Sequence, residues 1–131
     1  MIDEIFKYLF KLPLYQLVSV NDQNYLLVHA GLGNFSSDKK LDSYSVHELV
    51  WNRPDLSDSY FSNITTIMGH TPTESFSSKY KGRIIKTPTW IDIDTSAGWG
   101  GKPCILRLDD LKEFYFDQLS DSEMNPTISL K

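Results

Sequence analysis

The chain has 131 residues and a formal net charge of −4, and 40% of its residues are hydrophobic. This length allows one domain with a single hydrophobic core, and the composition is typical of a folded globular chain. Lys and Arg occur singly or in pairs, so no basic stripe marks the chain as a nucleic-acid-binding protein. The single cysteine, Cys104, excludes an internal disulfide framework.

Membrane association is not expected either. No apolar run approaches the ~20 residues that a membrane-spanning helix needs. Asp3 and Glu4 stand where a signal peptide would carry its positive charge. Together with the cysteine count, these features predict a cytoplasmic protein without a membrane partner.

The first half of the chain predicts a helix followed by a β-hairpin. Apolar residues at helical spacing between Ile2 and Phe10 predict an amphipathic helix that ends before Pro13. Residues 15–20 and 25–29 have strand-like patterns and flank the turn-forming residues 21–24, which predicts an antiparallel pair.

The middle of the chain contains a helix start, and the second half contains mainly strands. Ser45-Val46-His47-Glu48 has the pattern of a capping box and predicts the start of a short helix. Further strands are predicted at 64–70, 83–86, 90–94, 103–109 and 113–116. We therefore expect a mixed α/β domain over residues 1–119, with a mostly antiparallel sheet and about two or three helices. Residues 120–131 are interpreted as a polar tail.

Two of the three histidines stand at positions that indicate a site. His29 and His70 each follow an apolar strand and precede a small residue or threonine, whereas His47 lies within the capping box and is interpreted as a surface residue. Side chains at the carboxyl ends of strands often face a crevice, and two imidazoles meeting there form part of a metal site that needs further ligands. Taken singly, each of the two is equally compatible with a structural histidine in the core.

Five short motifs follow one another along the chain and carry a family resemblance. They are YLLVHAG at 25–31, LVWNR at 49–53, MGHTP at 68–72, IDTSA at 93–97 with GGK at 100–102, and LRL at 106–108. In this order and spacing, the chain resembles the carboxyl-terminal half of a calcineurin-like metallophosphoesterase. The most similar branch contains bacterial serine/threonine phosphoprotein phosphatases and symmetrical diadenosine tetraphosphate hydrolases.

The resemblance implies both a fold and an activity. The fold would be half of a four-layer α/β/β/α sandwich, and the activity would be hydrolysis of phosphate esters by a hydroxide that bridges two metal ions. By the same resemblance, His29 and His70 bind the second metal, Arg53 binds the substrate phosphate, and Asp94 orients a ligand or a turn. An ordinary surface role for Asp94 at its strand end stays open. The ions would be manganese, iron or zinc.

The family motifs that supply the other ligands do not occur in the chain. GDxHG, GDxxDRG and GNHE are absent, and the chain contains no Gly-Asp dipeptide. Ser96 also stands where the family usually has glycine. We therefore expect the metal site of this chain alone to be weak or empty, and the chain alone to be inactive or nearly so.

Three interpretations of the whole chain follow. In the first, the chain is part of an enzyme that acts on a phosphoprotein or a dinucleotide. The second is a non-catalytic, phosphatase-like remnant that serves as a binding or interaction module. The third is a domain whose histidines are only structural. Because family sheets are shared between the two halves, we also expect an exposed apolar sheet surface, through which a homodimer would form.

Overall fold

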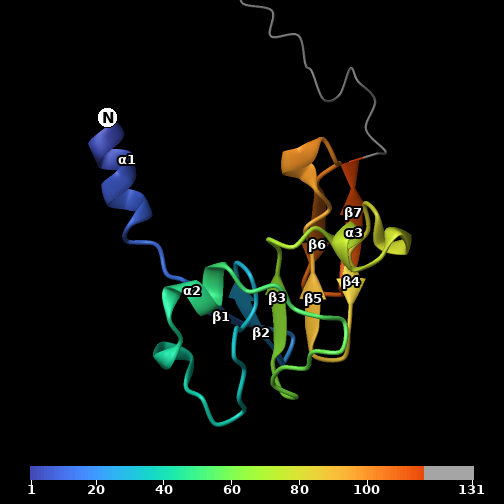
Figure 1. Cartoon of the computed structure of the whole chain (residues 1–131), viewed down its shortest axis with the longest axis horizontal. Coiled ribbons are helices and arrows are strands. Elements are labelled where there is room, and N and C mark those ends of the chain that lie inside the picture. The colour runs from blue at the N-terminus through green and yellow to red at the C-terminus, as the bar shows by residue number, and fades with distance from the viewer. Residues whose placement is uncertain (117–131) are drawn as a thin grey trace, which may run out of the picture.

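The computed structural model describes residues 1–116 and shows two sheets and several short helices (Figure 1). The strands are β1 (Tyr15–Val20), β2 (Gln23–Val28), β3 (Thr65–Met68), β4 (Ile85–Lys86), β5 (Trp90–Asp92), β6 (Cys104–Arg107) and β7 (Lys112–Tyr115). The α-helices are α1 (Ile2–Leu9), α2 (Val46–Val50) and α3 (Thr73–Phe76), with 3₁₀ turns at Leu41–Ser43, Ser78–Tyr80 and Ala97–Trp99. The predicted mixed α/β class is confirmed. The predicted tail at 120–131 lies outside the described residues.

The predicted hairpin is present, with a tighter turn than expected. β1 and β2 pair antiparallel, with Tyr15 opposite Val28. The turn consists of Asn21 and Asp22, whose φ angles are +48° and +61°. Asn and Asp tolerate this left-handed conformation, and such a turn follows the natural twist of paired strands. Two of the four predicted turn residues therefore belong to β2 instead.

The centre of the main sheet is parallel. The strand order is β1-β2-β3-β5-β4, and β2 pairs parallel with β3, as β3 does with β5. The other three pairings among the described residues, β1 with β2, β4 with β5 and β6 with β7, are antiparallel. The parallel centre places the carboxyl ends of β2, β3 and β5 along one edge of the sheet.

Several strands are shorter than the sequence pattern predicts. The segment predicted at 64–70 forms a strand only over Thr65–Met68, and the one predicted at 83–86 forms a strand only over Ile85–Lys86. The region between them contains α3, which the sequence pattern does not indicate. A helix of one turn has too few residues to show a helical repeat of apolar side chains.

Apolar side chains cover both faces of the main sheet. One core cluster consists of Leu26, Val28, Leu32, Tyr44, Leu49, Tyr60, Met68, Ile85 and Trp90. The second consists of Tyr25, Ile67, Ile84 and Ile91, with side chains of β6 and β7 packed against it. Neighbouring residues of one strand, such as Leu26 and Tyr25, belong to different clusters because side chains alternate between the two faces.

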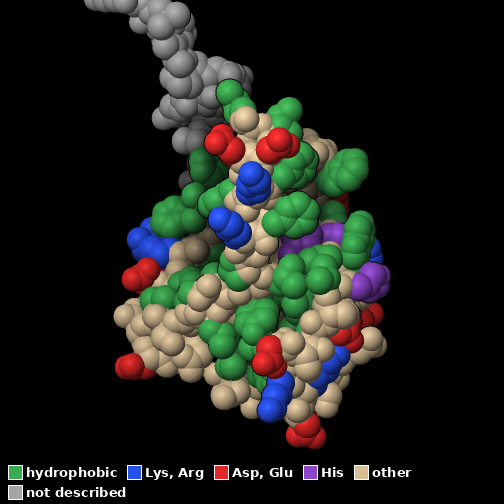
Figure 2. Space-filling view, turned by 90° about the vertical axis from the view of Figure 1, so that its left-hand side faces the viewer, with side chains coloured by type: hydrophobic (Ala, Val, Ile, Leu, Met, Phe, Trp, Pro, Cys, Tyr) green, Lys and Arg blue, Asp and Glu red, His purple; other side chains and the backbone are tan. Residues whose placement is uncertain are grey.

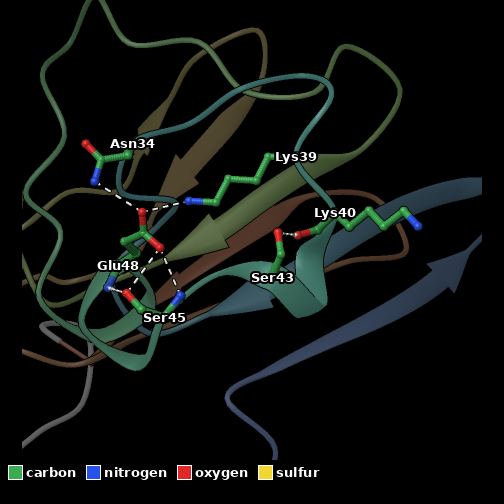
Figure 3. A network of polar contacts seen from close by, with 6 residues as sticks. All are labelled: Asn34, Lys39, Lys40, Ser43, Ser45 and Glu48. Carbon is green, nitrogen blue, oxygen red and sulfur yellow. Dashed lines mark hydrogen bonds and ion pairs between the residues drawn. The ribbon is translucent and has the colours of Figure 1, made fainter.

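The capping box at the start of α2 is confirmed and is extended by two further side chains (Figure 3). The Ser45 side chain accepts a hydrogen bond from the Glu48 amide at 3.2 Å, and the Glu48 carboxylate accepts one from the Ser45 amide at 2.9 Å. Lys39 and Asn34 donate to the other carboxylate oxygen, at 2.7 and 3.1 Å. The Lys39 bond and then the Ser45 amide lower the pKa of Glu48 to about 2. This network holds α2 against the loop that follows β2.

The predicted amino-terminal helix is also present, but it is not packed on the sheet. All residues from 1 to 14 are exposed, and Figure 1 shows α1 standing away from the rest of the fold. Within residues 1–116, no helix has the length and apolar character needed to cross a membrane.

Candidate metal and phosphate site

Three of the predicted site residues lie at the carboxyl ends of the three parallel strands. His29 directly follows β2, His70 comes two residues after β3, and Asp94 comes two residues after β5. Because these strands are parallel neighbours, the three residues lie at the same edge of the sheet. This edge is where open α/β sheets usually bind ligands.

The two histidines face one another. His29 Nε2 lies 3.1 Å from His70 Nδ1, and the ring centroids are 4.8 Å apart. The Gly69 amide donates a hydrogen bond to the His29 carbonyl at 2.9 Å, which joins the two loops through their backbones. The structure therefore brings together two side chains that are 41 positions apart in the sequence.

The distance between these nitrogens fits a shared metal ion. Two imidazole nitrogens bound to one ion at ~2.0–2.1 Å lie roughly 2.9–3.4 Å apart, depending on the coordination angle. The observed 3.1 Å falls within this range and also suits a hydrogen bond between two neutral rings. Burial lowers the pKa of His70, and the nearby His29 and Arg53 lower it further. His70 is thereby held in the neutral form that binds metals.

The backbone of His70 is strained. Its φ is +70°, and the Thr71 amide donates to the Gly69 carbonyl at 2.8 Å, so that His70 is the central residue of a three-residue turn. Side chains other than glycine rarely adopt this conformation, which costs about 1–3 kcal/mol. Nε2 of His70 is buried and has no hydrogen-bond partner among the described residues. Strain and an unpartnered polar atom on one residue are typical of a functional position.

The two imidazoles have no third metal-binding side chain beside them in the described part of the chain. No group of three or more His, Cys, Asp or Glu side chains within residues 1–116 is placed to hold a metal ion. Asp94 is close enough for its charge to favour the protonated form of His70. Its carboxylate, however, accepts a hydrogen bond from the Ser96 amide at 2.9 Å, and its carbonyl accepts one from the Thr73 amide at 2.9 Å. Asp94 therefore holds the turn that borders the site.

Ser96 occupies a backbone conformation that favours glycine. Its φ is +67°, in the left-handed region, at the position where the family resemblance implies a glycine. Its side chain is directed toward Glu74, with the two oxygens 3.3 Å apart. The turn thus keeps a glycine-like backbone although the residue is serine.

Helix α2 brings Trp51 and Arg53 to the same edge. The Ala30 amide donates to the Leu49 carbonyl at 3.0 Å, which joins α2 to the loop that carries His29. The Trp51 ring stands edge-on to His70, with centroids 5.5 Å apart, and is 61% exposed. Arg53 is exposed, and no carboxylate of the described residues forms an ion pair with it. Its guanidinium is available to an anion from solution.

Gly31 allows this close packing behind the site. Its φ is +86°, and a Cβ atom there would lie 2.7 Å from the Tyr60 hydroxyl and 2.8 Å from the Met68 sulfur. The side chain of Asn52 turns inward and donates to the same Tyr60 hydroxyl at 3.2 Å. A larger residue at position 31 would displace the loop that carries His29.

A buried carboxyl group behind the site was not singled out from the sequence. Asp92 is 0% exposed, one of its oxygens accepts a hydrogen bond from the Asp94 amide at 2.8 Å, and the other has no partner among the described residues. Burial raises the pKa of Asp92 to about 7. The alternation of side chains along β5 indicates this burial, because Asp92 lies on the same face as the fully buried Trp90.

A cavity of about 420 Å³ continues from the turn at Asp94. Its lining includes Ser96, the exposed Trp99 and three cationic side chains, Lys81, Arg83 and Lys102. Glu74 also lines it and pairs with Lys81 at 3.7 Å. Positive charge therefore predominates in this cavity, although the chain as a whole carries a net charge of −4.

No protein-family model matches the chain, and no curated protein matches it significantly.

Proposed function

We propose that this chain forms one side of a metal-dependent phosphoesterase site, in which His29 and His70 bind one divalent ion and Arg53 binds the substrate phosphate. The observation that carries the proposal is the 3.1 Å approach of the two imidazole nitrogens at the carboxyl ends of adjacent parallel strands. The strained backbone of His70 supports it independently.

The side chains of the chain have distinct roles in this proposal. The two imidazoles act as neutral nitrogen ligands, and the packing behind Gly31 and Gly69 holds them in place. The planar guanidinium of Arg53 offers two parallel donors to two phosphate oxygens and stays charged at neutral pH. When bound, divalent ions stabilise charge on the phosphate and supply a nucleophile at neutral pH. The cationic cavity beyond Asp94 suits the rest of an anionic substrate, whether phosphoprotein or dinucleotide.

Two neutral ligands without a carboxylate bind a divalent ion weakly. We therefore propose that residues outside this pair complete the coordination, and that the 131-residue chain by itself hydrolyses phosphate esters slowly or not at all. Manganese, iron and zinc are all compatible with imidazole ligands.

Metal titration tests the proposal directly. Zinc and manganese are titrated into the chain while the histidine ring signals are followed by NMR. We expect the His29 and His70 signals to shift or broaden first, and the responses to disappear in His29→Ala and His70→Ala. His47→Ala is the matched control, since His47 is exposed on α2 and should leave binding unchanged. Binding that is equal in all three variants would contradict the assignment.

A second titration distinguishes a non-catalytic phosphate-binding module from the proposed enzyme. Arg53 is exposed and unpaired among the described residues, so it can bind phosphate without a metal. Inorganic phosphate is titrated in the presence of a chelator, with Arg53→Gln as the variant and Arg107→Gln as the control. Binding that needs Arg53 but no metal, without hydrolysis of a phosphomonoester after manganese is added, would favour a phosphate-binding module over the enzyme.

A further inference from the structure

Helix α1 exposes a continuous apolar stripe. Ile2, Ile5, Phe6 and Leu9 lie at helical spacing and are 70%, 54%, 55% and 51% exposed. The charged side chains of the helix lie on the opposite face. An eight-residue helix is only marginally stable alone in water, so this helix needs a surface to pack on.

The chain also has an apolar groove that its own described residues leave open. The groove measures about 520 Å³ and runs over the ends of β1, β2 and β3, with a lining that includes Pro13, Leu14, Leu27, Ile67 and Ile93. His29 also lines it. Figure 2 shows hydrophobic side chains gathered around α1 and over the surface below it, beside the histidines. Both a helix face and a groove therefore lack partners within residues 1–116.

The connection between α1 and β1 disfavours packing of the helix into the groove of its own chain. Pro13 and Leu14 belong to this connection and already line the groove. Leu12 precedes a proline and is therefore biased toward an extended backbone, which makes a tight reversal costly. In Figure 1 the helix leads away from the sheet. A helix from another molecule reaches the groove without any change in this connection.

We propose that two copies of the chain exchange their α1 helices, so that each helix packs in the groove of the other copy. The exchange is reciprocal about a two-fold axis, which closes the assembly at two copies. It leaves Asp3, Glu4, Lys7 and Lys11 in solvent, because they lie off the apolar stripe.

The area available reaches the lower limit for a specific dimer interface. A Leu, Ile or Phe side chain buries on the order of 100 Å² of apolar surface. Six apolar side chains from Ile2 to Leu12, between 47% and 87% exposed, can therefore bury roughly 400 Å². The two exchanged helices therefore contribute roughly 800 Å² in total, and the smaller surfaces of the two grooves bring the interface to about 1,000 Å², the minimum for a specific interface.

Sedimentation velocity of the chain tests the exchange, without added metal and from low to high micromolar concentration. We expect a monomer–dimer equilibrium shifted toward the dimer. Phe6→Glu on the helix stripe and Leu14→Glu in the groove should each give a monomer. Tyr8→Glu is the matched control, since it introduces the same charge on an exposed aromatic of α1 outside the stripe, and it should remain dimeric. Circular dichroism checks that each variant is folded.

Mixing the two monomeric variants distinguishes reciprocal exchange from other dimers. The Leu14→Glu chain keeps an intact helix and the Phe6→Glu chain keeps an intact groove, so an equimolar mixture should restore one of the two contacts. We expect the mixture to associate more weakly than the wild type but more strongly than either variant alone. A wild-type monomer at all concentrations, a dimer unaffected by Leu14→Glu, or a mixture that stays monomeric would overturn the proposal. If either variant is unfolded, Leu9→Glu and Leu14→Gln replace the pair.

Discussion

Replacing Asp92 with asparagine is expected to remove a loss of stability that the wild type suffers as the pH rises. The Asp92 carboxyl group is 0% exposed, and one of its oxygens lacks a hydrogen-bond partner among the described residues. Burial raises its pKa from 3.8 to about 7. At a pH between these two pKa values, Asp92 keeps its proton in the folded chain but has released it in the unfolded chain. The free energy of unfolding therefore falls as the pH rises through this window, and the stability is fully present only below the lower value.

The magnitude follows from the shift in pKa. A rise from 3.8 to about 7 is roughly three pKa units, and each unit corresponds to about 1.4 kcal/mol. The expected loss for Asp92 between acidic and mildly alkaline pH is thus on the order of 4 kcal/mol. Domains of this size are stable by only about 5–15 kcal/mol, so the effect is a large fraction of the total.

Urea unfolding of the wild type and Asp92→Asn over the range from about pH 4 to pH 8 measures this effect. The asparagine side chain has nearly the shape of the protonated acid, so we expect the variant to gain stability relative to the wild type as the pH rises. Comparing the two proteins cancels the pH dependence of stability that other groups contribute. One such group is Glu48, whose lowered pKa affects stability at acidic pH. Asp38→Asn is the control at an exposed position. A stability difference that does not change with pH would refute the reasoning.

Substitutions at three further positions test the local geometry. His70→Gly should be more stable than His70→Ala by about 1 kcal/mol, because only glycine adopts a φ of +70° without strain, while both should lose metal binding. Equal thermal stability of the two would contradict the strain at this residue. Ser45→Ala should lower the free energy of unfolding by about 1 kcal/mol through loss of the cap at α2, measured by urea denaturation. Gly31→Ala should lower it by about 3 kcal/mol, since the new methyl group meets Tyr60 and Met68 at a positive φ, and an unchanged midpoint would rule out this contact.

Local patterns predicted the elements that depend on near neighbours. The helix before Pro13, the hairpin around Asn21 and the capping box at Ser45 all formed as expected. Each is specified by side chains within a few positions of one another, through helical spacing, turn conformation or a cap.

Strand lengths and buried polar groups were less predictable. The strand predicted through His70 ends at Met68, because the backbone turns sharply at His70. The strand predicted at 90–94 contains Asp92, but its pattern alone does not indicate that this carboxyl group is enclosed together with Trp90. Burial of that face depends on what packs over it, and segments distant in the sequence provide this cover.

The sequence by itself determined which residues are candidates for the site, because His29, His70, Arg53 and Asp94 stand in short motifs at the ends of predicted elements. Only the tertiary structure decided that the two imidazoles meet, since the parallel pairing of β2 with β3 brings together residues 41 positions apart. It also decided that Asp94 holds a turn and that α1 packs against nothing within residues 1–116. The physical reason is that pairing register and burial depend on long-range contacts, whereas caps, turns and helical spacing depend on adjacent residues.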